Sequence, residues 1–179
     1  MVTAKTLADT LTGLRVLIGA WLIWLGVTAG PEAAGLACLG LLLAWASDLL
    51  DGPLARRDPR QIRTWIGDHD LAVDVWASFG VWVYLAAAHF IATTIAVVYV
   101  VVVAIGLWRS HSVHLAWAVQ AVPYAAMIRV GVQYAPPYGL ALIIWVLTTV
   151  IVTWPRFPRE TVPQFLAGMR ALLRGDDTE

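Results

Sequence analysis

Long apolar stretches separated by short polar breaks run along the whole chain of 179 residues. The stretches contain few charged residues, and the breaks contain glycine, proline or charged side chains. A membrane-crossing helix needs about 20 predominantly apolar residues. The pattern therefore predicts membrane-spanning helices over residues 11–29, 33–50, 115–132 and 140–154, and it leaves a longer apolar stretch over residues 71–108.

The stretch 71–108 is too long for one crossing. It contains no Lys, Arg or Glu, and Asp74 is its only carboxylate. Since one crossing takes about 20 residues, we expect two spans here, with a turn near residues 89–94. The sequence thus predicts six transmembrane helices.

Composition supports a membrane protein. Hydrophobic residues make up 60% of the chain and charged residues only 13%. A water-soluble domain of this length needs a more charged surface, so lipid should cover most of this one. We predict an all-α integral membrane protein. The formal net charge of zero gives no indication of a nucleic-acid partner, and none is expected.

Lysine and arginine are distributed asymmetrically about the predicted spans. With six spans, both termini and the loops after the second and fourth spans share one side of the membrane. All Lys and Arg residues except Arg129 fall in these regions. The positive-inside rule therefore predicts a multi-pass protein of the cell membrane with both termini in the cytoplasm. A signal peptide is the alternative reading of the first span, but removing it would break this parity.

The segment after Trp154 differs from the rest of the chain. Three prolines interrupt it, and apolar residues then recur at helical spacing opposite Arg170 and Arg174. We expect a six-helix membrane domain over residues 1–155, followed by a short amphipathic helix and tail over residues 156–179. This helix lies in the cytoplasmic interface or packs on the bundle or a partner, and the pattern fits either position.

Four aspartates flank the break between the second and third spans. Asp48 and Asp51 end one apolar stretch and Asp70 and Asp74 begin the next, so each pair shares one helix face. Carboxylates gathered at the mouth of two apolar helices repel, and partial desolvation raises the cost of each charge. A cation must therefore lie among them. Hard oxygen ligands suit Mg²⁺, Mn²⁺ or Ca²⁺ rather than zinc.

Ordinary structural roles explain these aspartates unequally. Asp48 and Asp51 are expected at a helix C-terminus, where the helix dipole disfavours negative charge, so capping does not explain them. Asp70 falls in the first turn of a helix, where an acidic residue is as common a stabiliser as a ligand. Asp74 lies one turn deeper in an apolar helix, where a carboxylate indicates function.

The charged stretch resembles a family signature. Residues 48–56 read DLLDGPLAR, and after Gly67 residues 70–74 read DLAVD. This order is similar to the DxxDGxxAR, G and DxxxD blocks of the CDP-alcohol phosphotransferases, which are integral membrane enzymes. Residues 11–15, LTGLR, look like the LTxxR with which those enzymes begin their first span.

The resemblance implies a reaction and residue roles. Enzymes of this family transfer a substituted phosphate from a CDP-linked donor, usually CDP-diacylglycerol, to the hydroxyl of a small alcohol, free or phosphorylated, and release CMP. It implies a two-metal site of Mg²⁺ or Mn²⁺, with Asp74 also acting as the general base. It also implies a homodimer. The implied metal ligands are Asp48, Asp51, Asp70 and Asp74, and the implied nucleotide-binding residues are Gly52, Ala55, Arg56 and Gly67.

The chemistry of the nucleotide-binding residues agrees with these roles. Gly52 and Ala55 are small where a nucleotide must approach the backbone, and Arg56 offers a planar donor for phosphate. Gly52, which precedes Pro53, also fits a helix C-cap, and this is compatible with a binding role.

Alternative functions stay open at this point. Between Arg56 and Asp70 the chain has one residue more than is usual in the family, and Gly67 lies one place out of register. This departure motivates a catalytically silent relative that binds lipid or a partner. Some relatives use a soluble CDP-alcohol as donor. A divalent-cation transporter would also carry intramembrane carboxylates, but the last three predicted spans contain none. The acceptor alcohol is open.

Four other polar residues are weaker candidates. Arg109, His111 and His114 follow the fourth span on the predicted cytoplasmic side, where they contact an acceptor phosphate or belong to a solvated loop. Arg129 lies inside the fifth span, where it lines a polar pocket or extends to the far interface.

Overall fold

The computed structural model describes residues 4–56 and 69–174, and describes side chains for residues 6–50 and 69–174. The described residues are helical apart from short turns, which confirms the predicted all-α class. The elements are α1 (Ala4–Thr28), η1 (Gly30–Ala33), α2 (Ala34–Arg56), α4 (Asp70–Ala87), α5 (Thr93–Ser110), α6 (Val113–Tyr134), α7 (Pro136–Val152), η2 (Phe157–Thr161) and α8 (Val162–Arg174).

Five or six of these helices can cross a membrane. Among the described residues, α1, α2, α4, α5 and α6 are long and apolar enough to do so alone. Helix α7 has 17 residues and is long enough for a sixth span only when it is taken together with the following helical segment. An 84° bend separates the two. The expected turn within residues 71–108 is also confirmed, because α4 ends at Ala87 and α5 begins at Thr93.

Two helix boundaries differ from the sequence-based expectation. Helix α2 does not stop near residue 50 but continues through Gly52 and Pro53 to Arg56, so the expected C-cap at Gly52 is wrong. The second boundary is the start of α7, which lies at Pro136 and not near residue 140, so that only Ala135 separates α7 from α6. The first turn of a helix tolerates proline because the missing N–H is not needed there.

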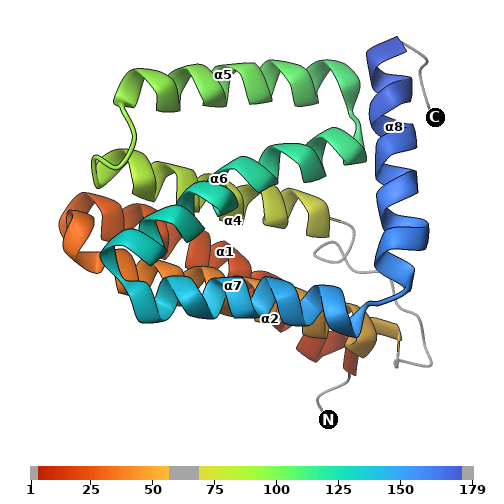
Figure 1. Cartoon of the computed structure of the whole chain (residues 1–179), viewed down its shortest axis with the longest axis horizontal. Coiled ribbons are helices and arrows are strands. Elements are labelled where there is room, and N and C mark those ends of the chain that lie inside the picture. Colours follow the sequence, from red (N-terminus) through yellow and green to blue (C-terminus); the bar gives the residue numbers. More distant parts are fainter. Residues whose placement is uncertain (1–3, 57–68, 175–179) are drawn as a thin grey trace.

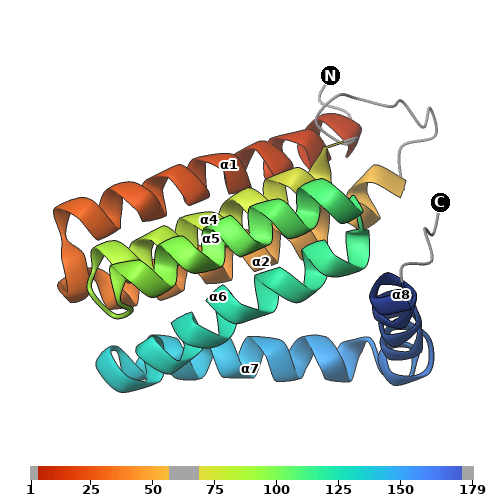
Figure 2. The ribbon, with the colours of Figure 1, turned by 90° about the horizontal axis from the view of Figure 1, so that it is seen from above.

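Helices α1, α2 and α4 pack together on one side of the bundle. Helix α1 lies along both α2 and α4, while α6 and α7 pack as a pair on the other side (Figures 1 and 2). Helix α5 lies at one edge, and Ala96 is the only buried residue within its described length. The core consists of side chains such as Leu22, Leu41 and Leu85, so α1 is an integral part of the fold.

Small residues bring α1 and α4 into close contact. A Cβ atom on Gly80 would lie only 2.5 Å from the carbonyl oxygen of Gly19, and one on Gly26 would lie 2.9 Å from Cα of Tyr84. Small residues of this kind let membrane helices pack backbone to backbone. Trp76 Nε1 also donates a hydrogen bond to the carbonyl of Val16 at 3.0 Å. This packing fixes how the start of α4 faces α1.

Helix α8 lies across the end of the bundle (Figure 1). It begins at Val162, before Pro163, and none of its described residues is buried. Gly168 is packed so closely on the ring of His114 that a Cβ atom there would overlap it. The expected short C-terminal helix is therefore present, and the bundle covers its apolar residues only in part, because Leu166 and Leu173 are exposed.

Candidate active site

Three of the predicted metal ligands converge at one end of the bundle. Asp48 comes from α2, and Asp70 and Asp74 come from the first turns of α4. One carboxylate oxygen from each residue lies within 4.8 Å of one from each of the others. Asp48, which lies 22 positions before Asp70 in the sequence, thus joins Asp70 and Asp74 in one anionic cluster, as predicted.

Arg15 of α1 lies within this cluster. Its side chain is only 1% exposed, and its guanidinium forms ion pairs with Asp48 at 2.8 Å and with Asp70 and Asp74. Arg15 Nη2 also donates to the hydroxyl of Thr12 at 3.3 Å, and this hydroxyl lies 3.5 Å from Asp70 Oδ1. Three helices are therefore joined through one buried guanidinium.

The position of Arg15 follows from the packing of α1 on α4. Gly19 lies one turn after Arg15, and its contact with Gly80 and Trp76 brings the backbones of the two helices together. Thr12 and Arg15 are three residues apart and share the helix face that is turned toward α4. The same close packing excludes lipid from the guanidinium, which is costly unless the charge is paired.

The three carboxylates differ in depth. Asp48 is 51% exposed, Asp70 is 42% exposed, and Asp74 is 24% exposed. Asp74 is the deepest because it lies one helical turn further along α4. The outer two carboxylates are thus more open to a ligand from solution than the inner one.

The donor set fits a divalent cation. The described ligands are carboxylate oxygens, the type that Mg²⁺ and Mn²⁺ prefer. Three carboxylates and one guanidinium carry a formal net charge of −2, which a single divalent cation neutralises. Asp51, whose side chain is not described, lies one turn after Asp48 in the same helix.

Comparison with known protein families agrees with this geometry. The model of the CDP-alcohol phosphatidyltransferase family matches residues 5–173 of the chain. The chain belongs to this family. Its members are transferases, so the predicted enzyme class is confirmed. Neither a curated protein nor a solved structure matches the chain.

The described part of the chain includes only some of the family's motif residues. Asp48, Asp70 and Asp74 meet in the cluster, as predicted. Gly52, Ala55 and Arg56 lie with Asp51 in the last turns of α2, where the structure describes the backbone alone, and Gly67 lies outside the described residues. Their roles in metal or nucleotide binding remain predictions.

The weaker candidates take different positions. Arg109 lies in the last turn of α5, and His111 caps this helix in a left-handed conformation with φ of 47°. His114 is in the first turn of α6, where its ring packs against Trp117 at a centroid distance of 5.6 Å and beneath Gly168. His114 of α6 thus packs against α8 and is not part of a solvated loop.

Sequence reasoning missed the role of Arg15, which counted only as an N-terminal positive charge. The available signal was the LTxxR-like motif. It places a hydroxyl and a guanidinium on one helix face at the predicted cytoplasmic end of a span. An arginine so deep in an apolar stretch needs an acidic partner, and the aspartates were the nearest candidates.

An apolar cavity adjoins the cluster between α2 and α7. It has a volume of about 310 Å³, and Asp48 lies at its border. Its walls include Trp45 and Leu49 from α2 and Trp145 and Thr149 from α7. A group held by the carboxylates can therefore extend into this apolar cavity within the bundle.

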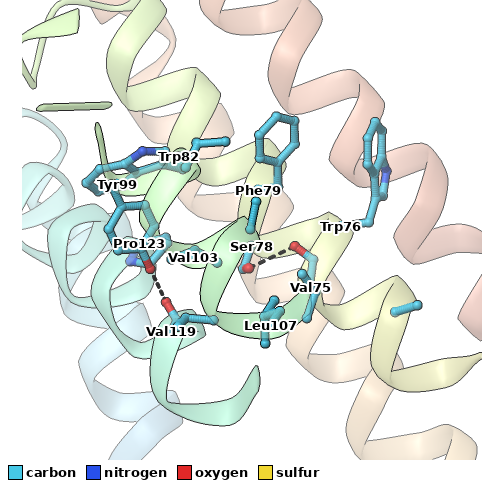
Figure 3. Close-up of a pocket in the computed structure, with 13 residues that line it drawn as sticks. Val75, Trp76, Ser78, Phe79, Trp82, Tyr99, Val103, Leu107, Val119 and Pro123 are labelled. Atoms are coloured by element: carbon cyan, nitrogen blue, oxygen red, sulfur yellow. Dashed lines mark hydrogen bonds between the residues drawn. The ribbon is translucent and has the colours of Figure 1, made fainter. Parts of the chain in front are cut away.

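A second apolar cavity lies on another face of α4 (Figure 3). It measures about 370 Å³ and separates α4 from α5 and α6. Its polar side chains are already bonded to backbone carbonyls, Ser78 to Val75 at 2.9 Å and Tyr99 to Val119. This cavity offers hydrocarbon surface only and lies outside the carboxylate cluster.

Proposed function

We propose that this family member transfers a phosphatidyl group from CDP-diacylglycerol to the hydroxyl of a small alcohol and releases CMP. The observation that carries the proposal is the convergence of Asp48, Asp70 and Asp74 in a protein of this family. Carboxylates grouped in this way suit the binding of divalent cations, and phosphoryl-transfer sites depend on such cations.

The chain's own residues divide the work by depth. Asp48 and Asp70, with Asp51, would hold Mg²⁺ or Mn²⁺, and the bound cation would supply positive charge for the pyrophosphate of the donor and the leaving CMP. Asp74, the deepest carboxylate, accepts the proton of the attacking hydroxyl. Arg56 binds donor phosphate, and Gly52, Ala55 and Gly67 leave room for the nucleotide. Arg15 keeps the carboxylates together before substrate arrives.

The cavity between α2 and α7 supports a lipid donor. Its Asp48 border places the phosphates beside the carboxylates, while its apolar walls suit the diacylglycerol part of the same molecule. A soluble CDP-alcohol would not need an apolar cavity of about 310 Å³ next to the proposed metal ligands. For this reason the lipid donor is preferred to the soluble one.

The membrane orientation and assembly belong to the same proposal. The carboxylate end faces the cytoplasm, because the lysine and arginine residues gather in the segments at that end. Helix α8 lies in the interface on that side, since its apolar residues Leu166 and Leu173 are exposed. The homodimer rests on family resemblance alone.

Release of CMP from CDP-diacylglycerol tests the proposal. Purified protein is assayed with Mg²⁺ or Mn²⁺ across a panel of acceptor alcohols, for wild type, Asp74→Asn and the control Glu32→Gln. Glu32 is an exposed carboxylate in η1, outside the cluster. We expect acceptor-dependent release that falls by about 10²- to 10⁴-fold in Asp74→Asn and is unchanged in Glu32→Gln.

The other outcomes separate the alternatives. Asp74-dependent release from a soluble CDP-alcohol, but not from the lipid, would overturn the lipid donor and retain the transferase. No release from either donor by folded, Mg²⁺-binding protein would favour the silent relative.

A further inference from the structure

The end of the bundle opposite the carboxylates contains a pocket of a different kind. It has a volume of about 240 Å³ and lies between the α4–α5 turn and the last turns of α6. Apolar side chains such as Leu85 and Ile91 form one part of its wall. His89, Arg129 and Gln133 form the other part, so nitrogen donors and hydrocarbon surface share one small site.

Arg129 has a cationic side chain and no acidic partner here. Among the described residues, no ion pair involves Arg129. A cation within a membrane-spanning helix is costly unless it finds a counter-charge or reaches the interface. The contrast with Arg15, which contacts three carboxylates, suggests that Arg129 receives its counter-charge from outside the protein.

His89 is held in an unusual backbone conformation beside Arg129. Its φ is 60°, in the left-handed region that favours glycine. Two turn hydrogen bonds fix it there, from His89 N to Ala86 O at 3.1 Å and from Phe90 N to Leu85 O at 2.9 Å. A histidine where glycine would be less strained indicates that its side chain is used.

The pocket lies at the level of lipid head groups. Arg129 is five residues before the end of α6 at Tyr134, or about 7.5 Å along the helix axis. The polar interface of a bilayer is about 5 to 7 Å thick on each side. The rings of Phe90 and Tyr134, which also line the pocket, contact each other at a centroid distance of 4.9 Å with a tilt of 51°, as expected for aromatic residues at an interface.

We propose that this pocket binds a phosphate group, that of an anionic phospholipid in the leaflet opposite the carboxylate cluster. Arg129 supplies the positive charge and a planar pair of donors, and His89 and Gln133 add further donors. The apolar wall covers the glycerol and upper acyl carbons of the same lipid. The site is separate from the proposed transferase chemistry and does not depend on it.

Lipid retention by purified protein tests the site. Wild type, Arg129→Gln and Arg109→Gln are reconstituted in nanodiscs of phosphatidylcholine with a minor share of phosphatidylglycerol, then released and examined by native mass spectrometry. Arg109→Gln removes the same charge from an exposed arginine at the other end of the bundle. We expect phosphatidylglycerol occupancy to fall about tenfold in Arg129→Gln and to match wild type in Arg109→Gln.

A second arm and a second variant complete the design. Inorganic phosphate is titrated against wild type in discs of phosphatidylcholine alone, at constant ionic strength. A rise in the unfolding midpoint that depends on Arg129 would assign the site to free phosphate.

His89→Gly keeps Arg129 and relieves the backbone strain, so a folded variant with reduced occupancy is expected even if Arg129→Gln does not fold. Equal occupancy in wild type and both pocket variants, with no phosphate effect, would overturn the site. Equal losses in Arg109→Gln and Arg129→Gln would also overturn it, because they indicate general charge attraction.

Discussion

Two of the helices that contact α4, α1 and α5, differ in how closely they pack against it. On the α1 side, Gly80 contacts Gly19 backbone to backbone, and Arg15 of α1 joins the carboxylates of α4 to that of α2. On the α5 side, a cavity of about 370 Å³ lies between the helices, and its polar groups are satisfied internally. The first contact is tight and charged, and the second is loose and apolar.

The difference shows where this fold needs rigidity. In the proposed function the carboxylates hold a cation and a phosphate, which requires them to stay within a fraction of an ångström of one geometry, and the backbone contact between α1 and α4 supports this. The α5 side carries no reacting group and faces hydrocarbon, which fills irregular spaces at little cost. The chemistry is therefore built on one face of α4 and the adaptable contact on another.

Replacing Arg15 should give the largest effect on stability. Arg15→Gln leaves three neighbouring carboxylates without their shared cation, and breaking a buried charge network costs about 3 to 5 kcal/mol. Because Mg²⁺ neutralises the same carboxylates, it should restore more stability to the variant than to wild type. Thermal unfolding in detergent with and without Mg²⁺ measures both quantities.

Arg15→Lys is the matched control, since it keeps the charge but loses the planar guanidinium that contacts three carboxylates. We expect an intermediate unfolding midpoint. If Arg15→Gln unfolds at the wild-type temperature, or if Mg²⁺ stabilises it no more than wild type, the central position of Arg15 would be refuted.

A single added carbon at the α1–α4 contact should have the next largest effect. In Gly80→Ala the new Cβ lies 2.5 Å from the carbonyl oxygen of Gly19, and neither backbone can move without separating the helices. Overpacking of this kind costs about 1 to 3 kcal/mol. The unfolding midpoint should fall, and Mg²⁺ affinity should fall with it because Asp70 and Asp74 move away from Asp48.

A loss of stability with unchanged Mg²⁺ affinity would show that the cluster does not depend on this helix contact. Isothermal titration of wild type and Gly80→Ala at a temperature where both are folded separates the two cases.

The sequence predicted the overall fold and the aspartates well because both depend on strong local signals. The length of the apolar stretch 71–108 indicated a turn, which lies between Ala87 and Thr93, and helical spacing placed Asp70 and Asp74 on one face. Charge repulsion then required a cation among the aspartates. Composition and helical periodicity can be read from one sequence without knowing how the helices pack.

What the sequence did not show depends on which helix faces which. Arg15 reads as an ordinary positive charge until the contact of Gly19 with Gly80 places α1 against α4. The end of α2 was misplaced because glycine followed by proline is a local stop signal, and the continuing helix overrides it. The pocket around Arg129 likewise needs the α4–α5 turn beside α6.

One added carbon on the loose side of α4 should have the smallest effect, and it makes a matched pair with Gly80→Ala. Val103 of α5 lines the cavity of Figure 3, so Val103→Ile places its extra carbon in open apolar space. The gain is small, because lipid is as apolar as the cavity and no water is displaced. The unfolding free energy should therefore stay within about 0.5 kcal/mol of wild type. A loss comparable to that in Gly80→Ala would mean that α5 packs on α4 as closely as α1 does, and the contrast between the two sides would fail.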